Sequence, residues 1–315
     1  MRLVTFRMEG AQEPVLGALE NGKVIDLSAA SGGMIPPRMQ DFLEVGEDAL
    51  SRAREILRAA PRSAVYPLSE VRLLAPLPRP PSLKDFFAFE YHALAGAKRR
   101  GEELAKEWHE IPAYYKGNHR AIFGPEDEIP WPYYTRKLDF ECEIACVIGR
   151  EGRNLTPEQA EEHIFGYTIF NDFSARDIQK KEMLLRMGPA KGKDFANAFG
   201  PYLVTKDEVD PVRDFSMTVR VNGEIWSQGH FKNQYWGFPL MVSYLSQEET
   251  VYPGDIVGSG TFYKGCGLDL DRWIKPGDVV ELEVPKLGIL KNKIGAPQDQ
   301  KQLHYGSYRQ ARQAA

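Results

Sequence analysis

The sequence predicts a mixed α+β fold that is mostly β, in which the strands form a sandwich or roll with helices at its periphery. Short strand-like segments recur along the C-terminal two thirds of the chain, and turn signals such as Asn222-Gly223 and Pro253-Gly254-Asp255 separate them. These strands do not alternate regularly with helices, which disfavours a wound βαβ sheet. With 315 residues, 43% hydrophobic and 27% charged, the composition is that of an ordinary soluble globular protein.

The first 75 residues are predicted to form a small N-terminal α+β domain. Glu20-Asn21-Gly22 is a hairpin signal between two strands, and apolar residues at helical spacing follow it. The proline-rich segment 74–81 is stiff and extended, because each proline fixes its own φ angle and disfavours helix in the residue before it. The boundary is therefore placed there, with a larger domain at 76–315. The elements expected in the small domain are strands at 2–7, 15–20 and 23–27 and a helix at 41–60.

The larger domain is predicted to mix both kinds of element. Thr156-Pro157-Glu158-Gln159 has the form of a capping box, with proline at the first helical position, and opens a helix that ends near His163. The other helices are expected at 88–108 and 174–185, and the strands at 139–148, 164–170, 202–205, 215–222, 256–260 and 279–284.

Charge and cysteine content narrow the class of protein. A net charge of −4 gives no reason to expect nucleic acid as a partner, and no apolar run approaches the roughly 20 residues that span a bilayer. The start of the sequence has no apolar stretch typical of a signal peptide. Three cysteines at irregular spacing argue against a disulfide framework. A cytoplasmic location is therefore expected.

The most informative segment is Asp139 to Ile148, which is predicted to be a buried strand. Because side chains alternate along a strand, Glu141 and Glu143 point the same way, roughly 7 Å apart. The apolar residues Cys142, Ile144, Cys146 and Ile148 line the other face. Two carboxylates held near apolar neighbours favour a hard divalent cation such as Mg²⁺, Mn²⁺ or Ca²⁺. The alternative is an exposed strand whose glutamates pair with Lys or Arg across the sheet.

Further polar groups follow this strand. Asp172 ends an apolar strand where the chain turns into a helix, and Arg176 and Gln179 are i,i+3 neighbours on that helix. The segment Gly188 to Phe195 is superficially similar to a phosphate-binding loop, but its glycine spacing is one short and Asp194 stands where Ser or Thr would hold Mg²⁺. Nucleotide binding is therefore rejected.

Taken together, these segments resemble the fumarylacetoacetate hydrolase family over nearly all of residues 75–295. The segments that carry the resemblance, in the family's order, are Lys84-Asp85-Phe86-Phe87 with Glu90-Tyr91-His92-Ala93, Asp139 to Val147, Gly166 to Gln179, Gly192 to Phe195, and Pro253-Gly254-Asp255 with Gly258 to Thr261. The resemblance implies a mixed β-sandwich roll around a divalent metal, often preceded by a small β-rich domain.

The resemblance also implies roles for particular residues. Taken alone, His92 would be a helix-surface histidine and Lys193 an ordinary loop lysine; the resemblance makes them catalytic. The implied metal ligands are Glu141, Glu143, Asp172 and Asp85. The implied catalytic residues are His92 as the base that activates water, Asp269 as its orienting partner, and Lys193, Arg176 and Gln179 as donors to an oxyanion or enolate. The implied substrate contacts are Phe87, Tyr115, Met183 and Thr261.

The activity that this resemblance implies is metal-dependent hydrolysis of a carbon–carbon bond in an acylpyruvate or another β-diketo acid, in the catabolism of aromatic compounds, by a homodimer that uses Mg²⁺. Phe87 and Met183 depart from the tyrosines that fumarylacetoacetases carry, and no arginine matches the one that binds the distal carboxylate. A different substrate is therefore open. The alternatives are isomerisation of a hydroxyheptadienedioate, decarboxylation of an oxaloacetate-like acid, or a catalytically silent homologue.

Overall fold

The computed structural model of the protein describes residues 1–299, and a 12-stranded sheet forms the centre of this part of the chain. Its order is β4-β3-β2-β1-β14-β12-β11-β17-β6-β7, with β5 beside β1 and β8 beside β14. The strands are β1 (Arg2–Met8), β2 (Val15–Glu20), β3 (Lys23–Asp26), β4 (Val65–Pro67), β5 (Val71–Leu74), β6 (Leu83–Phe86), β7 (Tyr114–Lys116), β8 (Ile122–Phe123), β11 (Cys142–Ile148), β12 (Ile164–Asp172), β14 (Asn197–Thr205) and β17 (Ile256–Gly258).

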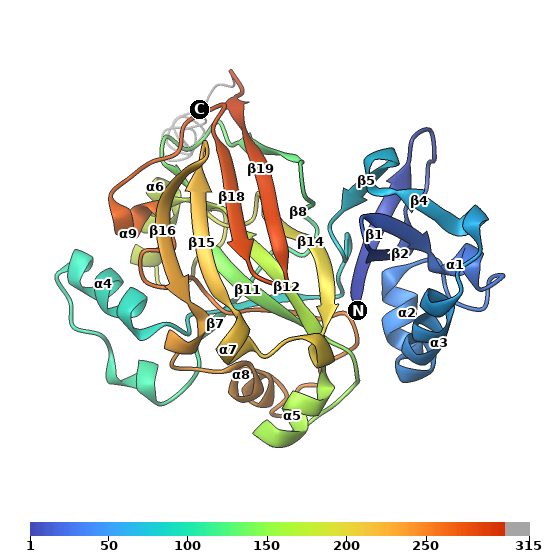
Figure 1. Ribbon diagram of the computed structural model, residues 1–315. Helices are drawn as coiled ribbons and strands as arrows, with labels where there is room; N and C mark the ends of the chain where they lie inside the picture. Colours follow the sequence, from blue (N-terminus) through green and yellow to red (C-terminus); the bar gives the residue numbers. More distant parts are fainter. Residues whose placement is uncertain (300–315) are drawn as a thin grey trace, which may run out of the picture.

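A five-stranded sheet packs against the middle of the large one, and Figure 1 shows its strands β15, β16, β18 and β19 in front of β11 and β12. Its order is β16-β15-β18-β19-β9. The strands are β9 (Glu128–Trp131), β15 (Ser216–Val221), β16 (Glu224–His230), β18 (Val279–Val284) and β19 (Gly288–Pro297), and a separate pair is formed by β10 (Leu138–Asp139) and β13 (Ser174–Ala175). The predicted mixed, mostly β fold is confirmed.

The helices lie around these sheets, with α5 and α8 below them and α4 at the left in Figure 1. None of the helices within residues 1–299 has the length and apolar character that crossing a bilayer requires. Their bounds are α1 (Leu27–Ala30), α2 (Met39–Val45), α3 (Glu47–Arg58), α4 (Glu90–Arg100), α5 (Pro157–His163), α6 (Arg176–Leu184), α7 (Pro211–Asp214), α8 (Phe238–Leu245) and α9 (Gly267–Leu270).

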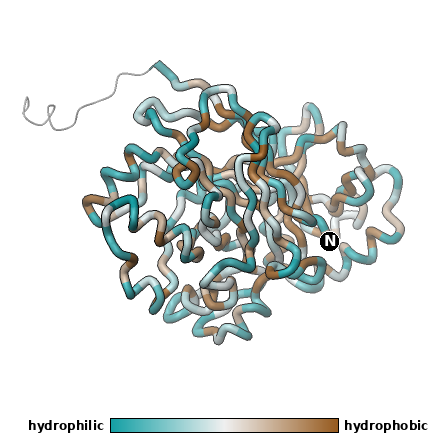
Figure 2. The backbone as a smooth tube through the Cα atoms, turned by 60° about the vertical axis from the view of Figure 1, so that its left-hand side comes forward, coloured by the Kyte–Doolittle hydropathy of each residue, from teal (hydrophilic) through white to brown (hydrophobic). Residues whose placement is uncertain are grey.

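Strand β11 lies at the junction of two hydrophobic cores. Its residues Cys142, Ile144, Cys146 and Ile148 are fully buried against the five-stranded sheet, as the alternation predicts. Ala145 and Val147, on the other face, pack in a second core with residues of α2 and α3. Figure 2 shows hydrophobic residues, in brown, along strands in the middle of the molecule. Glu143 alternates onto the face of Ala145 and Val147, so a charged group lies among buried residues there.

Several boundaries differ from the prediction for local reasons. The helix expected at 41–60 is divided at Gly46, whose φ of 73° ends α2 before α3 begins. The helix expected at 88–108 ends at Arg100, because Gly101 adopts the left-handed conformation typical of a helix terminus. The strand expected at 139–148 is interrupted: Glu141 makes only an isolated bridge, to Cys266. The predicted capping box of Thr156 and Gln159 is present.

The N-terminal segment continues the large sheet. Strand β1 pairs antiparallel with β14, with Leu3 opposite Leu203, so the sheet extends across the predicted boundary at residue 75. The proline-rich segment lies between β5 and β6. The division into domains at 1–75 and 76–315 stays a prediction, and the contact between β1 and β14 shows how the two parts are joined.

Candidate active site and metal centre

Three buried carboxylates converge on the face of the large sheet that carries Glu143. Asp85 comes from β6, Glu143 from β11 and Asp172 from the last position of β12. One oxygen atom of each lies within 4.8 Å of the others, and at most 3% of any of these residues is exposed. The sequence predicts all three as metal ligands, and the structure brings them together.

The free oxygen atoms of this trio suit a divalent cation. The backbone N–H of Gly260, where φ is 73°, donates to Glu143 Oε2 at 3.0 Å and to Asp85 Oδ1 at 3.2 Å. Glu143 Oε1 and Asp172 Oδ1 are buried and have no hydrogen-bond partner among residues 1–299. Carboxylate oxygens are the ligands that Mg²⁺, Mn²⁺ and Ca²⁺ prefer, so the residues present fit such an ion.

Glu141, the fourth predicted ligand, forms ion pairs with two basic side chains of the protein. Its Oε1 accepts from Arg176 Nη2 at 2.7 Å, and its Oε2 accepts from Lys193 Nζ at 2.6 Å. Lys193 Nζ also donates to Asp172 Oδ2. Glu141 thus lies next to the trio and is linked to it through Lys193, and its role as a direct ligand stays a prediction. The alternative of an exposed strand, whose glutamates would pair with Lys or Arg across the sheet, is wrong, because Glu141 and Glu143 are both buried.

Burial and mutual repulsion disturb the ionisation of the trio. Burial raises the pKa of Asp85 and of Glu143 well above the usual range, and the neighbouring carboxylates raise both further. Burial also raises the pKa of Asp172, to about 6, although the Lys193 ammonium opposes it. The pKa of Glu141 is lowered: burial acts against this, but Arg176 and Lys193 outweigh it.

Cation binding should therefore be coupled to proton release. An ion competes with protons for the oxygens of Asp85, Glu143 and Asp172, so the apparent affinity for Mg²⁺ should increase as the pH rises from about 5 to about 8. Calorimetric titration at each pH, in two buffers of different ionisation enthalpy, measures both the affinity and the number of protons released. An affinity that stays constant over this range would contradict the assignment of these carboxyls as ligands.

A histidine–carboxylate pair lies beside the carboxylates. His92, in the first turn of α4, places Nδ1 2.7 Å from Asp269 Oδ2, although 177 residues separate the two in sequence. Arg99 Nη1 donates to Asp269 Oδ1 at 2.9 Å. Burial raises the pKa of Asp269, but the hydrogen bond and charge of His92 and the bond from Arg99 outweigh it, so this pKa is lowered. An ionised Asp269 keeps the proton of His92 on Nδ1 and leaves Nε2 as an acceptor.

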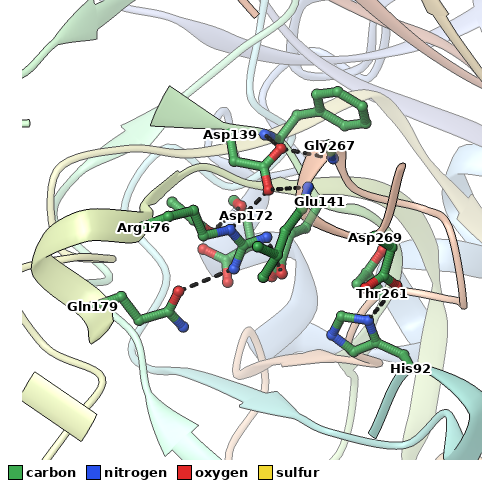
Figure 3. A network of polar contacts seen from close by, with 12 residues as sticks. His92, Asp139, Glu141, Asp172, Arg176, Gln179, Thr261, Gly267 and Asp269 are labelled. Carbon is green, nitrogen blue, oxygen red and sulfur yellow. Dashed lines mark hydrogen bonds and ion pairs between the residues drawn. The ribbon is translucent and has the colours of Figure 1, made fainter. Parts of the chain in front are cut away.

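Asp139 connects the two halves of the site, and Figure 3 shows it between Arg176 and Gly267. Its Oδ2 accepts from Arg176 Nε at 2.7 Å and its Oδ1 from the backbone N–H of Gly267, also at 2.7 Å. Gly267 begins α9, the helix that carries Asp269. The sequence motifs assign no role to Asp139. It stands two residues before Glu141, however, and this period-two spacing is a signal in the sequence that Asp139 belongs to the same row of carboxylates.

The other predicted site residues lie around this network. Arg176 Nη1 donates to Gln179 Oε1 at 3.0 Å, so Arg176 forms hydrogen bonds with Asp139, Glu141 and Gln179.

The predicted substrate contacts lie in different surroundings. The Phe87 ring packs edge-on to the His92 ring, with 5.4 Å between the ring centroids. Tyr115 is half-buried and donates to Asp172 Oδ2 at 2.8 Å, which makes it a partner of the carboxylates. Thr261 Oγ1 donates to the carbonyl oxygen of Cys142 at 3.1 Å, and Met183 lies on the exposed side of α6. Substrate contact by Phe87, Tyr115, Met183 and Thr261 stays a prediction.

Comparison with known proteins places this site in a family. The model of the fumarylacetoacetate (FAA) hydrolase C-terminal domain matches residues 84–295. Human "Oxaloacetate tautomerase FAHD2A, mitochondrial" is 34% identical over 299 residues, which cover 93% of this chain and 91% of the human protein. "Oxaloacetate tautomerase YisK" of Bacillus subtilis is 30% identical over 292 residues, 88% of this chain and 94% of that protein.

A solved structure gives the same result. The fumarylacetoacetate hydrolase of the psychrophile Exiguobacterium antarcticum is 28% identical and has a TM-score of 0.75, with 94% of this chain and 99% of that chain covered. The names of the two sequence relatives describe a tautomerisation, which favours the isomerase alternative over hydrolysis of a carbon–carbon bond. This chain is an enzyme of the fumarylacetoacetate hydrolase family.

Proposed function

We propose that this enzyme catalyses keto–enol tautomerisation of oxaloacetate or a closely similar 2-oxo dicarboxylate, assisted by a divalent cation. The observation that carries the proposal is the similarity to two proteins named oxaloacetate tautomerases over at least 88% of this chain. The arrangement of His92, Asp269 and Lys193 beside the carboxylate trio supports it. Tautomerisation needs a base that reaches the methylene carbon and a positive charge near the carbonyl oxygen.

The reaction moves one proton from carbon to oxygen and shifts two electron pairs. In the keto form, a base removes a proton from the methylene carbon next to the carbonyl group, and the electron pair of that C–H bond becomes the C=C bond of the enol. At the same time the π electron pair of the C=O bond moves onto the oxygen. The carbonyl oxygen gains a proton, so the atoms balance without water. His92 Nε2 is the acceptor that its contact with Asp269 leaves free, and the same nitrogen can return the proton in the reverse direction.

Lys193 stabilises the charge that develops on the oxygen, and a divalent ion held by the carboxylate trio would add to this effect. The pKa of Lys193 is raised: burial lowers it, but Asp172 and Glu141 outweigh burial, so the side chain is a cation next to the trio. Asp85, Glu143 and Asp172 would hold the divalent ion, with Glu141 at its side, and the ion would act there as a Lewis acid toward the substrate oxygens. Magnesium is the proposed ion, and manganese and calcium are the alternatives that the same oxygen ligands permit.

Hydrolysis of an acylpyruvate is the second candidate. The structure at 28% identity is named a fumarylacetoacetate hydrolase, and a histidine held by a carboxylate can activate water as well as remove a proton from carbon. Hydrolysis, a role in aromatic catabolism, a cytoplasmic location and a homodimer stay predictions from the sequence.

Assays of both reactions on one preparation distinguish the two candidates. With Mg²⁺ or Mn²⁺ present, the enzyme should accelerate the approach of freshly dissolved oxaloacetate to its keto–enol equilibrium, which is followed by the ultraviolet absorbance of the enol. Chelator treatment should remove this acceleration. No carboxylic acid should be released from an acylpyruvate at a comparable rate. Release of acid and pyruvate from the acylpyruvate, with the oxaloacetate equilibration unchanged, would contradict the proposal and favour the hydrolase.

A further inference from the structure

The segment before Lys193, which is only superficially similar to a phosphate-binding loop, forms an anion-binding turn. The anion that this turn holds is a carboxylate of the protein itself. Three consecutive backbone N–H groups of this segment converge on the Glu182 side chain from α6. Ala190 N and Gly192 N each donate to Oε2 at 3.1 Å, and Lys191 N donates to Oε1 at 2.6 Å. Successive N–H groups of this kind form a concave site for an anion, and here Glu182 supplies it.

The same segment lies in backbone contact with its surroundings. The carbonyl oxygen of Gly192 accepts from Ala175 N at 2.7 Å, and that of Lys191 accepts from Tyr134 Oη at 3.1 Å. A Cβ atom on Gly192 would lie 2.8 Å from Gln179 N, so only glycine permits this approach to α6. Within residues 1–299, Glu182 is the one side chain that accepts from three N–H groups of this turn.

Lys193 follows this turn directly. Its own N–H donates to the carbonyl oxygen of Ala190 at 2.8 Å, which makes the backbone of Lys193 part of the same folded unit. Its side chain is 3% exposed and reaches Glu141 and Asp172. A shift of the turn would therefore move the ammonium group relative to both carboxylates.

We propose that Glu182 is a positioning residue, whose carboxylate fixes the turn at 190–192 and thereby places the Lys193 ammonium between Glu141 and Asp172. The consequence for catalysis rests on the proposed tautomerase function, whereas the positioning itself does not. Glu182 is half-buried and lies away from the hydrophobic cores, so its substitution should leave the fold intact.

The experiment compares Glu182→Ala and Glu182→Gln with wild type, and uses Lys181→Gln as a control on an exposed neighbour in the same helix. Hydrogen exchange followed by mass spectrometry measures the exchange rate of the backbone amides of residues 190–192. The rate of acetylation by acetic anhydride measures how accessible the Lys193 amine is. In Glu182→Ala both rates should increase. Glu182→Gln, which keeps one acceptor oxygen, should lie between Glu182→Ala and wild type, and Lys181→Gln should behave as wild type.

Kinetics provide a separate measurement. The tautomerase kcat of Glu182→Ala should fall on the order of 10- to 100-fold with little change in KM, because the displaced ammonium acts on charge that develops during the reaction. Unchanged exchange at 190–192 and unchanged acetylation of Lys193 in Glu182→Ala would overturn the positioning role. Increased exchange and acetylation would support that role even if the wild-type protein proved inactive on oxaloacetate, which would count against the proposed function alone.

Discussion

Replacing Glu143 with glutamine should abolish binding of Mg²⁺ and Mn²⁺ and, with it, the metal-dependent activity. Glu143 Oε1 is buried without a partner among the described residues, and it lies beside the carboxylates of Asp85 and Asp172. An amide supplies a single neutral oxygen in place of a carboxylate. The loss of metal affinity should therefore be larger than the roughly 10- to 100-fold loss that is typical when a residue that hydrogen-bonds to a metal ligand is replaced. Calorimetric titration with each ion measures this directly.

The matched control for this substitution is Glu281→Gln, which changes a glutamate of β18 in the other sheet. That variant should bind the ion with wild-type affinity. Full metal binding by Glu143→Gln would remove the carboxylate trio from the mechanism.

The same substitution should not destabilise the metal-free protein at neutral pH. Because the pKa of Glu143 is raised by burial and by Asp85, the folded state binds its proton more tightly than the unfolded state does. The free energy of unfolding therefore falls as the pH rises from the unfolded pKa through the folded one. Removing the carboxyl removes this cost, by about 1.4 kcal/mol for each pKa unit, so the stability at pH 7 should hold or rise. Urea denaturation of the metal-free proteins at pH 7 and at about pH 4 would measure the difference, which should vanish at the lower pH.

Replacing His92 with alanine should reduce tautomerisation by about 10²- to 10⁴-fold, the range typical of a general acid–base group. Metal affinity should be unchanged, because His92 contacts Asp269 and is not a member of the carboxylate trio. Exchange of the methylene protons of oxaloacetate with deuterium from the solvent should fall in parallel, since removal of such a proton is the step assigned to His92 Nε2. Nuclear magnetic resonance follows this exchange independently of any product.

The deuterium measurement also tests the hydrolytic alternative. If His92 only activated water, the His92→Ala variant would still enolise its substrate and exchange these protons at the wild-type rate. His109→Ala provides the matched control, because His109 forms a similar pair on the surface, 2.8 Å from Glu90. Wild-type tautomerisation by His92→Ala would show that the base has been assigned wrongly.

Asp269→Asn should show a milder form of the same defect. The substitution keeps a side chain of the same size but removes the charge that holds the proton of His92 on Nδ1. The amide oxygen can still accept from the Nδ1–H of His92 and so keep Nε2 as an acceptor, whereas the amide N–H favours the other tautomer, so only a part of the enzyme loses its base.

Much of the fold follows from local patterns that the chain carries on its own. The alternation along β11 predicts which residues face the core, and the hairpin at Asn21-Gly22 and the capping box at Thr156 form as their chemistry requires. The turn residues locate several strand ends, whereas Gly46 and Gly101 end helices that apolar periodicity alone extends too far. A glycine in the left-handed conformation is indistinguishable in sequence from one that a helix tolerates, so the error has a physical cause.

For the candidate site, too, the sequence identifies some features, and the tertiary structure decides the others. The motifs identify the acidic residues, His92 and Lys193 by resemblance, but in sequence Glu141 and Glu143 are equivalent members of one period-two row. The tertiary structure separates them. Arg176 and Lys193, 35 and 52 residues further on, reach Glu141, whereas Glu143 faces Asp85 and Asp172. Which carboxylate meets a cation of the protein and which stays free for a metal depends on contacts between distant strands and loops, and no local periodicity encodes those contacts.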